Sequence, residues 1–178
     1  IGSGLVGSEM CIRDRDWNFG WFMEKVVLPT VAFVGRLFPN LTVQGLGDPN
    51  YAYSLLKQYK GEWEFDTNWK MIFGHPKKAG WIKAIQEAQQ TVQKGLKLDC
   101  PILVMSSNKS FPETETWHEE YMTSDIVLDV QDIQKYGEKL GDKVTRDTIP
   151  NGIHDLILSQ KPYRNDAYQT IFEWLKKQ

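Results

Sequence analysis

A strand–helix–strand pattern between residues 99 and 155 most constrains how this chain can fold. After Cys100-Pro101, residues 102–105 form an apolar run whose length and branched side chains are typical of a buried parallel strand. Residues 143–149 alternate between apolar and polar and predict a second strand, which Pro150-Asn151-Gly152 ends. The pattern therefore predicts an α/β fold.

A helix is expected between these two strands. Residues 130–140 place Val130, Ile133, Tyr136 and Leu140 on one helical face. Gly141 then follows, and glycine is a common residue just after the end of a helix. The segment thus reads as the helix that connects one strand to the next.

Two side chains of catalytic type lie on the loops that follow these strands. Asp125 is the second residue of the segment Ser-Asp-Ile-Val-Leu-Asp after the first strand, and His154 follows the second strand. In open α/β sheets, ligands and chemistry gather on loops past the carboxyl ends of strands. An imidazole there can act as a general base if an acid fixes its tautomer. Asp125 and His154 therefore predict the acid–histidine half of a hydrolase triad.

Other acidic and histidine side chains have simpler interpretations. Asp129 is a rival acid in the same loop, but it lies nearer the helix start, where N-capping explains it. Asp155 is expected to point away from a strand-end pocket, as a cap or a salt-bridge partner. His75 and His118 lack ligand spacing to cysteine or to another histidine, so no metal site is predicted and both are expected to be solvated or packing residues.

The composition indicates an ordinary soluble globular domain. The chain has 178 residues with 41% hydrophobic and 25% charged side chains, enough for one domain with a core. A net charge of −2 gives no basic face for nucleic acid or an anionic membrane. The longest apolar candidate, residues 26–38, is interrupted and too short to span a bilayer. Cys11 and Cys100 make no disulfide framework, so a reduced, cytoplasmic protein is expected.

The chain divides into three expected regions. Residues 1–15 are glycine-rich and resemble translated adaptor read-through, so they are excluded from the fold and expected to be poorly ordered; a natural flexible N-terminus is the alternative. Residues 16–79 predict a cap of short helices without a strand. Residues 80–178 predict the C-terminal part of the core.

Within the cap, helices are expected over 21–27, over 30–38 after a break at Pro29, and over 51–59 with Asp48 as N-cap and Pro49 at the first helical position.

Aromatic residues are frequent in and just after the predicted cap. A helix beginning at Gly80-Trp81 carries an apolar stripe to Leu96, and Trp81 is expected to face the core. Four further tryptophans, taken one by one, are also most simply core residues. Together they could line an acyl or other apolar pocket; they are Trp17, Trp21, Trp63 and Trp69.

These segments resemble the α/β-hydrolase family, most of all its lysophospholipase-like or serine-aminopeptidase-like branch. The resemblance covers residues 16–178, with 101–105 as the seventh strand, 124–130 as the acid loop and 152–156 as the histidine loop. It implies an enzyme without a cofactor that cleaves an apolar ester or related acyl substrate. In this family the order along the chain is nucleophile, acid, histidine, and the acid maps best onto Asp125.

The sequence departs from the family at one essential point, because no G-x-S-x-G nucleophile elbow is present. The expectation is a truncated gene model: the C-terminal part of a hydrolase whose serine lies outside the chain, with an unpaired sheet edge and no activity alone. Two alternatives remain open. One is a catalytically silent binding module of the α/β-hydrolase type, and the other is an enzyme with a dehalogenase-like aspartate nucleophile.

Overall fold

A computed structural model describes residue 26 and residues 28–44, 47–114 and 116–178. The segment 1–15, and with it Trp17 and Trp21, lies outside the described residues, as does most of the helix expected over 21–27.

The predicted strand–helix–strand unit is present. Strand β3 (Ile102–Ser107) and strand β4 (Val144–Ile149) run parallel, in a register that pairs their first residues and their last residues with one another. The connecting helix α5 (Val130–Gly137) continues into a 3₁₀ turn, η3 (Glu138–Leu140). The expected α/β fold class is confirmed, and the parallel register brings the carboxyl ends of both strands side by side.

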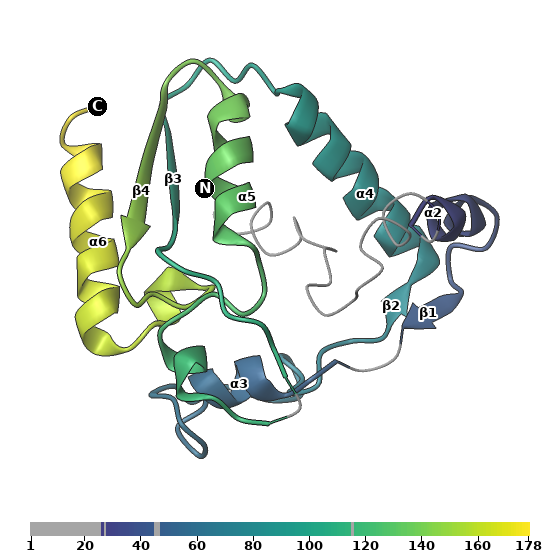
Figure 1. The fold of residues 1–178 in the computed structure, drawn as a ribbon, viewed down its shortest axis with the longest axis horizontal. Helices are drawn as coiled ribbons and strands as arrows, with labels where there is room; N and C mark the ends of the chain where they lie inside the picture. Colours follow the sequence, from purple (N-terminus) through teal and green to yellow (C-terminus); the bar gives the residue numbers. More distant parts are fainter. Residues whose placement is uncertain (1–25, 27, 45–46, 115) are drawn as a thin grey trace.

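Two helices enclose this strand pair. Helix α6 (Lys161–Leu175) and helix α5 lie on opposite sides of β3 and β4 (Figure 1). A short 3₁₀ helix, η2 (Glu119–Met122), precedes the acid loop, and another, η4 (Leu156–Leu158), follows His154. The buried apolar side chains of this part come from the acid loop, β4, the histidine loop and the helices; they are Tyr121, Met122, Ile126, Leu128, Val130, Ile149, Ile153 and Ala167. The core thus lies directly beneath the two loops that carry Asp125 and His154.

The region before β3 is helical, with one small ribbon. Helix α2 (Leu28–Leu37) packs on helix α4 (Ala79–Lys94), which leads away from the strand pair (Figure 1). Strands β1 (Thr42–Gln44) and β2 (Lys77–Lys78) pair antiparallel beside them. The expectation of a region without strands was therefore wrong. Strands of three and two residues are too short to show a period-two pattern.

The helix boundaries predicted from proline and capping residues in this region were also wrong. Helix α2 begins at Leu28 and contains Pro29, because proline is tolerated in the first turn of a helix. Helix α3 (Asn50–Leu55) is shorter than the expected 51–59, and its N-cap position is Pro49 rather than Asp48. Trp81 is 38% exposed on α4, whose buried residues are Ala79, Ile82 and Val92, so its expected core position was wrong.

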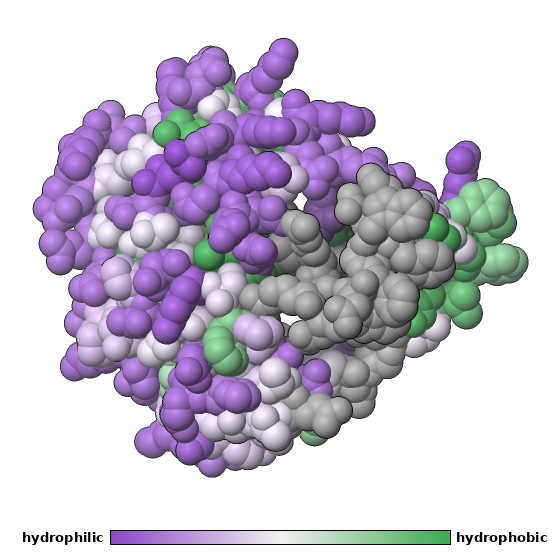
Figure 2. All heavy atoms as spheres, viewed as in Figure 1, coloured by the Kyte–Doolittle hydropathy of each residue, from purple (hydrophilic) through white to green (hydrophobic). Residues whose placement is uncertain are grey.

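Apolar side chains are also exposed on the surface near α2. Figure 2 shows green side chains gathered at the α2 end of the molecule, on a face that is otherwise largely hydrophilic. Phe33 and Leu37 of α2 and the neighbouring Phe38 are each more than half exposed, at 64%, 58% and 63%. Across the part of the chain that the structure describes, no helix combines the length and apolar character needed to cross a membrane.

Candidate active site

The acid loop folds back onto the end of β3 and places Asp125 there. Beyond the strand, Ser110 and Asp125 form an isolated parallel bridge. The Asp125 N–H donates to the Lys109 carbonyl at 3.0 Å, and the Phe111 N–H donates to the Asp125 carbonyl at 2.9 Å. Asp125 therefore lies past the carboxyl end of a parallel strand, although it comes 18 residues after the strand ends in the sequence.

The Asp125 side chain is almost completely enclosed, with 1% of the residue exposed. Its Oδ1 atom accepts hydrogen bonds from the backbone N–H groups of Val127 and Leu128, at 2.8 and 2.7 Å. These two donors compensate for the loss of water around the carboxylate and fix its orientation. The second oxygen, Oδ2, is directed at His154.

His154 meets that oxygen. Its Nδ1 atom lies 2.9 Å from Asp125 Oδ2, and only 8% of the His154 side chain is exposed. Since an ionised carboxylate can only accept a hydrogen bond, Nδ1 must carry the proton in this pair. In the neutral ring, Nε2 is then the basic nitrogen, and it can take a proton from a nucleophile or return one to a leaving group.

The surroundings of His154 favour its charged form. Burial is the largest single influence and lowers the pKa of His154. The hydrogen bond to Asp125, the charge of Asp125 and the charge of Asp155 together outweigh it, and Lys70 opposes them slightly, so the pKa of His154 lies above its ordinary value. A proton accepted by this ring during a reaction would therefore be stabilised.

The loop that carries His154 is held from both sides. Asn151 has φ 58°, a left-handed conformation that asparagine tolerates better than most residues, and its N–H donates to the Asn108 side chain at 3.0 Å. Asn108 belongs to the loop that follows β3, so this bond joins the two strand ends. On the other side, the N–H of Ile153 donates to the buried hydroxyl of Ser159 at 3.0 Å.

The rival acids are engaged elsewhere. Asp129 is the N-cap of α5, where its side chain accepts from the Gln131 N–H at 2.9 Å. The Asp155 carboxylate contacts Lys70 at 3.9 Å and the Tyr51 hydroxyl at 2.5 Å. The structure thus brings together Asp125 and His154, and leaves Asp129 as a cap.

The remaining histidines stand apart from this site. His75 is exposed, and the ring of His118 packs against Phe111 and Tyr121. Among the residues that the structure describes, no group of three or more histidine, cysteine, aspartate or glutamate side chains is arranged to hold a metal ion.

Sequence reasoning missed Tyr51. This residue lies on α3, and its ring meets the His154 ring edge to face at 5.9 Å between centroids. The contact spans more than 100 positions and leaves no local pattern, so the sequence held no signal for it.

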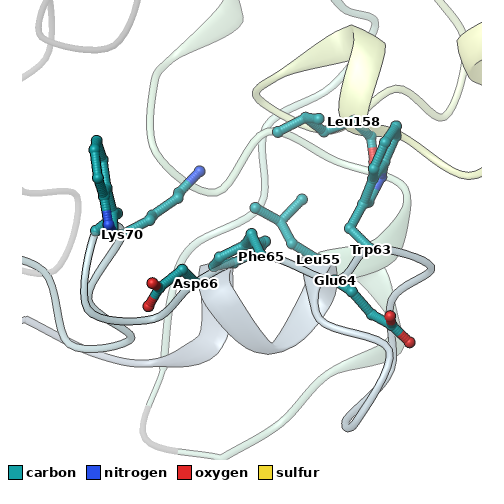
Figure 3. Close-up of a pocket in the computed structure, with 8 residues that line it drawn as sticks. Leu55, Trp63, Glu64, Phe65, Asp66, Lys70 and Leu158 are labelled. Carbon is teal, nitrogen blue, oxygen red and sulfur yellow. The ribbon is translucent and has the colours of Figure 1, made fainter.

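A hollow of about 440 Å³ lies beside the histidine loop (Figure 3). Its lining comes mainly from the segment after α3, with Leu158 from the far side; the residues are Leu55, Trp63, Glu64, Phe65, Asp66, Trp69, Lys70 and Leu158. In Figure 3 the Lys70 amine points inward, while the two carboxylates point away from the apolar side chains. Two of the tryptophans expected to line an apolar pocket, Trp63 and Trp69, line this hollow, and Trp69 is 86% exposed.

The parallel strands, the connecting helix and the loops past their ends define the fold of part of an α/β-hydrolase. The crystal structure of a soluble variant of monoglyceride lipase from Saccharomyces cerevisiae, in complex with a substrate analog, matches 88% of this chain with a TM-score of 0.53. The sequence identity is 13%, so the likeness concerns the fold. The chain spans about half (50%) of the length of that lipase. No protein-family model and no curated protein sequence matches the chain.

Proposed function

We propose that this chain is the acid- and histidine-bearing part of a serine hydrolase that cleaves carboxylic esters or related acyl bonds. The observation that carries the proposal is the 2.9 Å contact between His154 Nδ1 and Asp125 Oδ2 at the carboxyl ends of two parallel strands. The fold supports it, because it matches half of a lipase. The nucleophilic serine would come from outside these 178 residues, since the sequence contains no G-x-S-x-G.

In this mechanism the serine, His154 and Asp125 have distinct roles. The serine hydroxyl attacks the acyl carbonyl, and His154 Nε2 takes the hydroxyl proton. Asp125 holds the ring and stabilises the imidazolium that forms. His154 then returns the proton to the leaving alcohol. In the second half, His154 takes a proton from water, whose oxygen attacks the acyl carbonyl, and gives that proton to the serine oxygen as the acid is released. Backbone N–H groups that stabilise the oxyanion would also lie outside this chain.

The proposed substrate is a small apolar ester. The hollow beside the histidine loop is lined mainly by Leu55, Trp63, Phe65 and Leu158, which suit an acyl chain. The relative in yeast is described as a monoglyceride lipase, which supports the same class of substrate.

The test uses the complete reading frame. We expect a G-x-S-x-G segment upstream, hydrolysis of short acyl esters by the complete protein, and a loss of kcat of about 10⁴-fold in Asp125→Asn. His154→Ala should be at least as damaging, while Asp129→Asn, the matched control, should keep near-normal turnover. Residues 1–178 alone should show no turnover. Turnover by this chain that His154→Ala abolishes would contradict the proposal that the nucleophile lies elsewhere.

The competing function is a catalytically silent binding module. The missing elbow in this chain is the observation that favours it. A complete reading frame with no nucleophile at the elbow would support that function, and an aspartate at the elbow would support dehalogenase-like chemistry instead.

A further inference from the structure

The Tyr51 hydroxyl both donates a hydrogen bond to Asp155 and accepts one from it, and Asp155 directly follows His154 in the chain. The hydroxyl donates to Asp155 Oδ2 at 2.5 Å, and the Asp155 backbone N–H donates back to the same hydroxyl oxygen at 3.3 Å. Because one of these bonds involves the side chain of Asp155 and the other its backbone, Tyr51 fixes the peptide immediately after His154 as well as the carboxylate.

The ring of Tyr51 also contacts the imidazole. The two rings meet at 76°, with centroids 5.9 Å apart. This edge-to-face arrangement is favourable for aromatic pairs. The His154 ring is thereby held by Asp125 at Nδ1 and by Tyr51 against its side.

Helix α3, which carries Tyr51, is fixed by hydrogen bonds of its buried polar side chains. The neighbouring Asn50 is buried, and its side-chain amide donates to the Thr114 carbonyl at 3.0 Å. Ser54 is buried as well, and its hydroxyl donates to the Tyr51 carbonyl at 2.8 Å. Since α3 is tied to the loop between β3 and the acid, the Tyr51 hydroxyl has a fixed position relative to Asp125.

Lys70 completes the arrangement. Its amine lies 3.9 Å from Asp155 Oδ2 and 5.3 Å from the centre of the Tyr51 ring. The Asp155 carboxylate thus contacts both a hydroxyl and an amine. Asp155 therefore connects the loop that carries His154 to Tyr51 and Lys70, whereas Asp125 is the acid that contacts the imidazole.

We propose that Tyr51 is a positioning residue for His154, acting through Asp155 to keep the imidazole Nδ1 on Asp125. The inference rests on the proposed function in so far as His154 is the base of a hydrolase. It adds that a residue from outside the strand–helix–strand unit sets the orientation of that base.

The experiment is proton NMR of the imidazole N–H of His154 in the chain 1–178. A ring N–H bonded to a buried carboxylate exchanges slowly and resonates far downfield, so it reports the contact with Asp125 directly. Disappearance of the signal in Asp125→Asn assigns it. In Tyr51→Phe, which keeps the ring but removes the hydroxyl, we expect the signal to be lost to exchange with water.

Three further variants separate positioning from other effects. Asp155→Ala removes the same attachment from the other end and should also lose the signal. Asp155→Asn keeps an acceptor for the Tyr51 hydroxyl and should retain it. Tyr53→Phe is the matched control, because Tyr53 lies on the same helix but its ring packs against Tyr59; it should behave as the wild type.

Retention of the signal in folded Tyr51→Phe, or in Asp155→Ala, would overturn the inference. So would its loss in Asp155→Asn, since the charge of Asp155 would then be what matters. The measurement needs no nucleophile, so its outcome is independent of whether the complete protein hydrolyses esters. If the complete protein proves inactive while Tyr51→Phe still loses the signal, the proposed function fails and the positioning role stands.

Discussion

The buried hydroxyl of Ser159 accepts a hydrogen bond from the backbone N–H of Ile153 at 3.0 Å, and this bond closes the loop that carries His154. The loop leaves β4 at Ile149 and turns at Gly152, whose N–H donates to the Ile149 carbonyl at 3.1 Å. Ser159 thus supplies the partner that the backbone of Ile153 would otherwise lack in a buried position.

Ser159→Ala should therefore destabilise the chain by about 1–3 kcal/mol, because the Ile153 N–H is left buried without a partner. Ser124→Ala is the matched control. Ser124 is equally buried, but its hydroxyl has no hydrogen-bond partner among the described residues. Its removal should change the free energy of unfolding by less than about 0.5 kcal/mol or increase it. Urea denaturation measures both, and equal losses would contradict the assignment.

Asp125→Asn should lower the pKa of His154. Burial, the largest influence, already lowers that pKa, and the hydrogen bond and charge of Asp125 are the main influences that raise it. Asp129→Asn should leave it unchanged, because Asp129 caps α5 and asparagine caps equally well. An NMR titration of the His154 ring, assigned with His154→Gln, distinguishes the two acids. A larger fall in Asp129→Asn would reassign the acid.

The raised pKa of His154 also predicts how stability depends on pH. A group whose pKa is higher in the folded state stabilises the fold fully below its unfolded pKa, about 6.5 for histidine. This contribution is lost as the pH rises through the folded pKa. The charged groups that set the folded pKa of His154 are Asp125, Asp155 and Lys70. The ring of Tyr51 also contacts the imidazole.

We therefore expect the stability difference between wild type and His154→Gln to shrink as the pH rises from about 6.5. Urea unfolding of both proteins across this range measures it. A difference that grows with pH would show that burial lowers the pKa of His154 in the folded chain.

The part of the fold that local patterns specify was predictable. The apolar run before Ser106 and the alternation ending at Ile149 each coincide with a strand of six residues. The loop positions of Asp125 and His154 then follow, because parallel strands bring their carboxyl ends together. The capping position of Asp129 was also readable, since an aspartate before an apolar helical face is a common N-cap.

What the sequence did not predict depends on contacts between distant segments. Tyr51 meets Asp155 across 104 positions, and no local pattern encodes that pairing. Strand β1 forms because Thr42 pairs with Lys78 of β2, and each of these two strands alone is too short to show a strand pattern in the sequence. Trp81 fits the apolar helical spacing, yet it is 38% exposed, because the spacing alone does not show which residues of α4 other segments cover.

Gly35 marks the closest approach of α2 to α4, and its replacement offers a test of that packing. A Cβ atom at this buried position would lie 2.3 Å from the Ala79 carbonyl oxygen, a backbone atom that cannot rotate away. Alanine favours a helix over glycine by about 1 kcal/mol, but the overlap should exceed this gain. Gly35→Ala is therefore expected to destabilise the chain by about 1–3 kcal/mol.

Gly47→Ala is the matched control for this change. The nearest atom to its Cβ would be the Phe73 carbonyl oxygen at 3.6 Å, an ordinary contact, so the free energy of unfolding should change by less than about 0.5 kcal/mol. Urea midpoints compare the two variants. Because α2 lies far from the histidine loop (Figure 1), the His154 N–H signal should survive in Gly35→Ala while the protein remains folded. Equal stability of both variants would show that α2 can move away from α4 without cost.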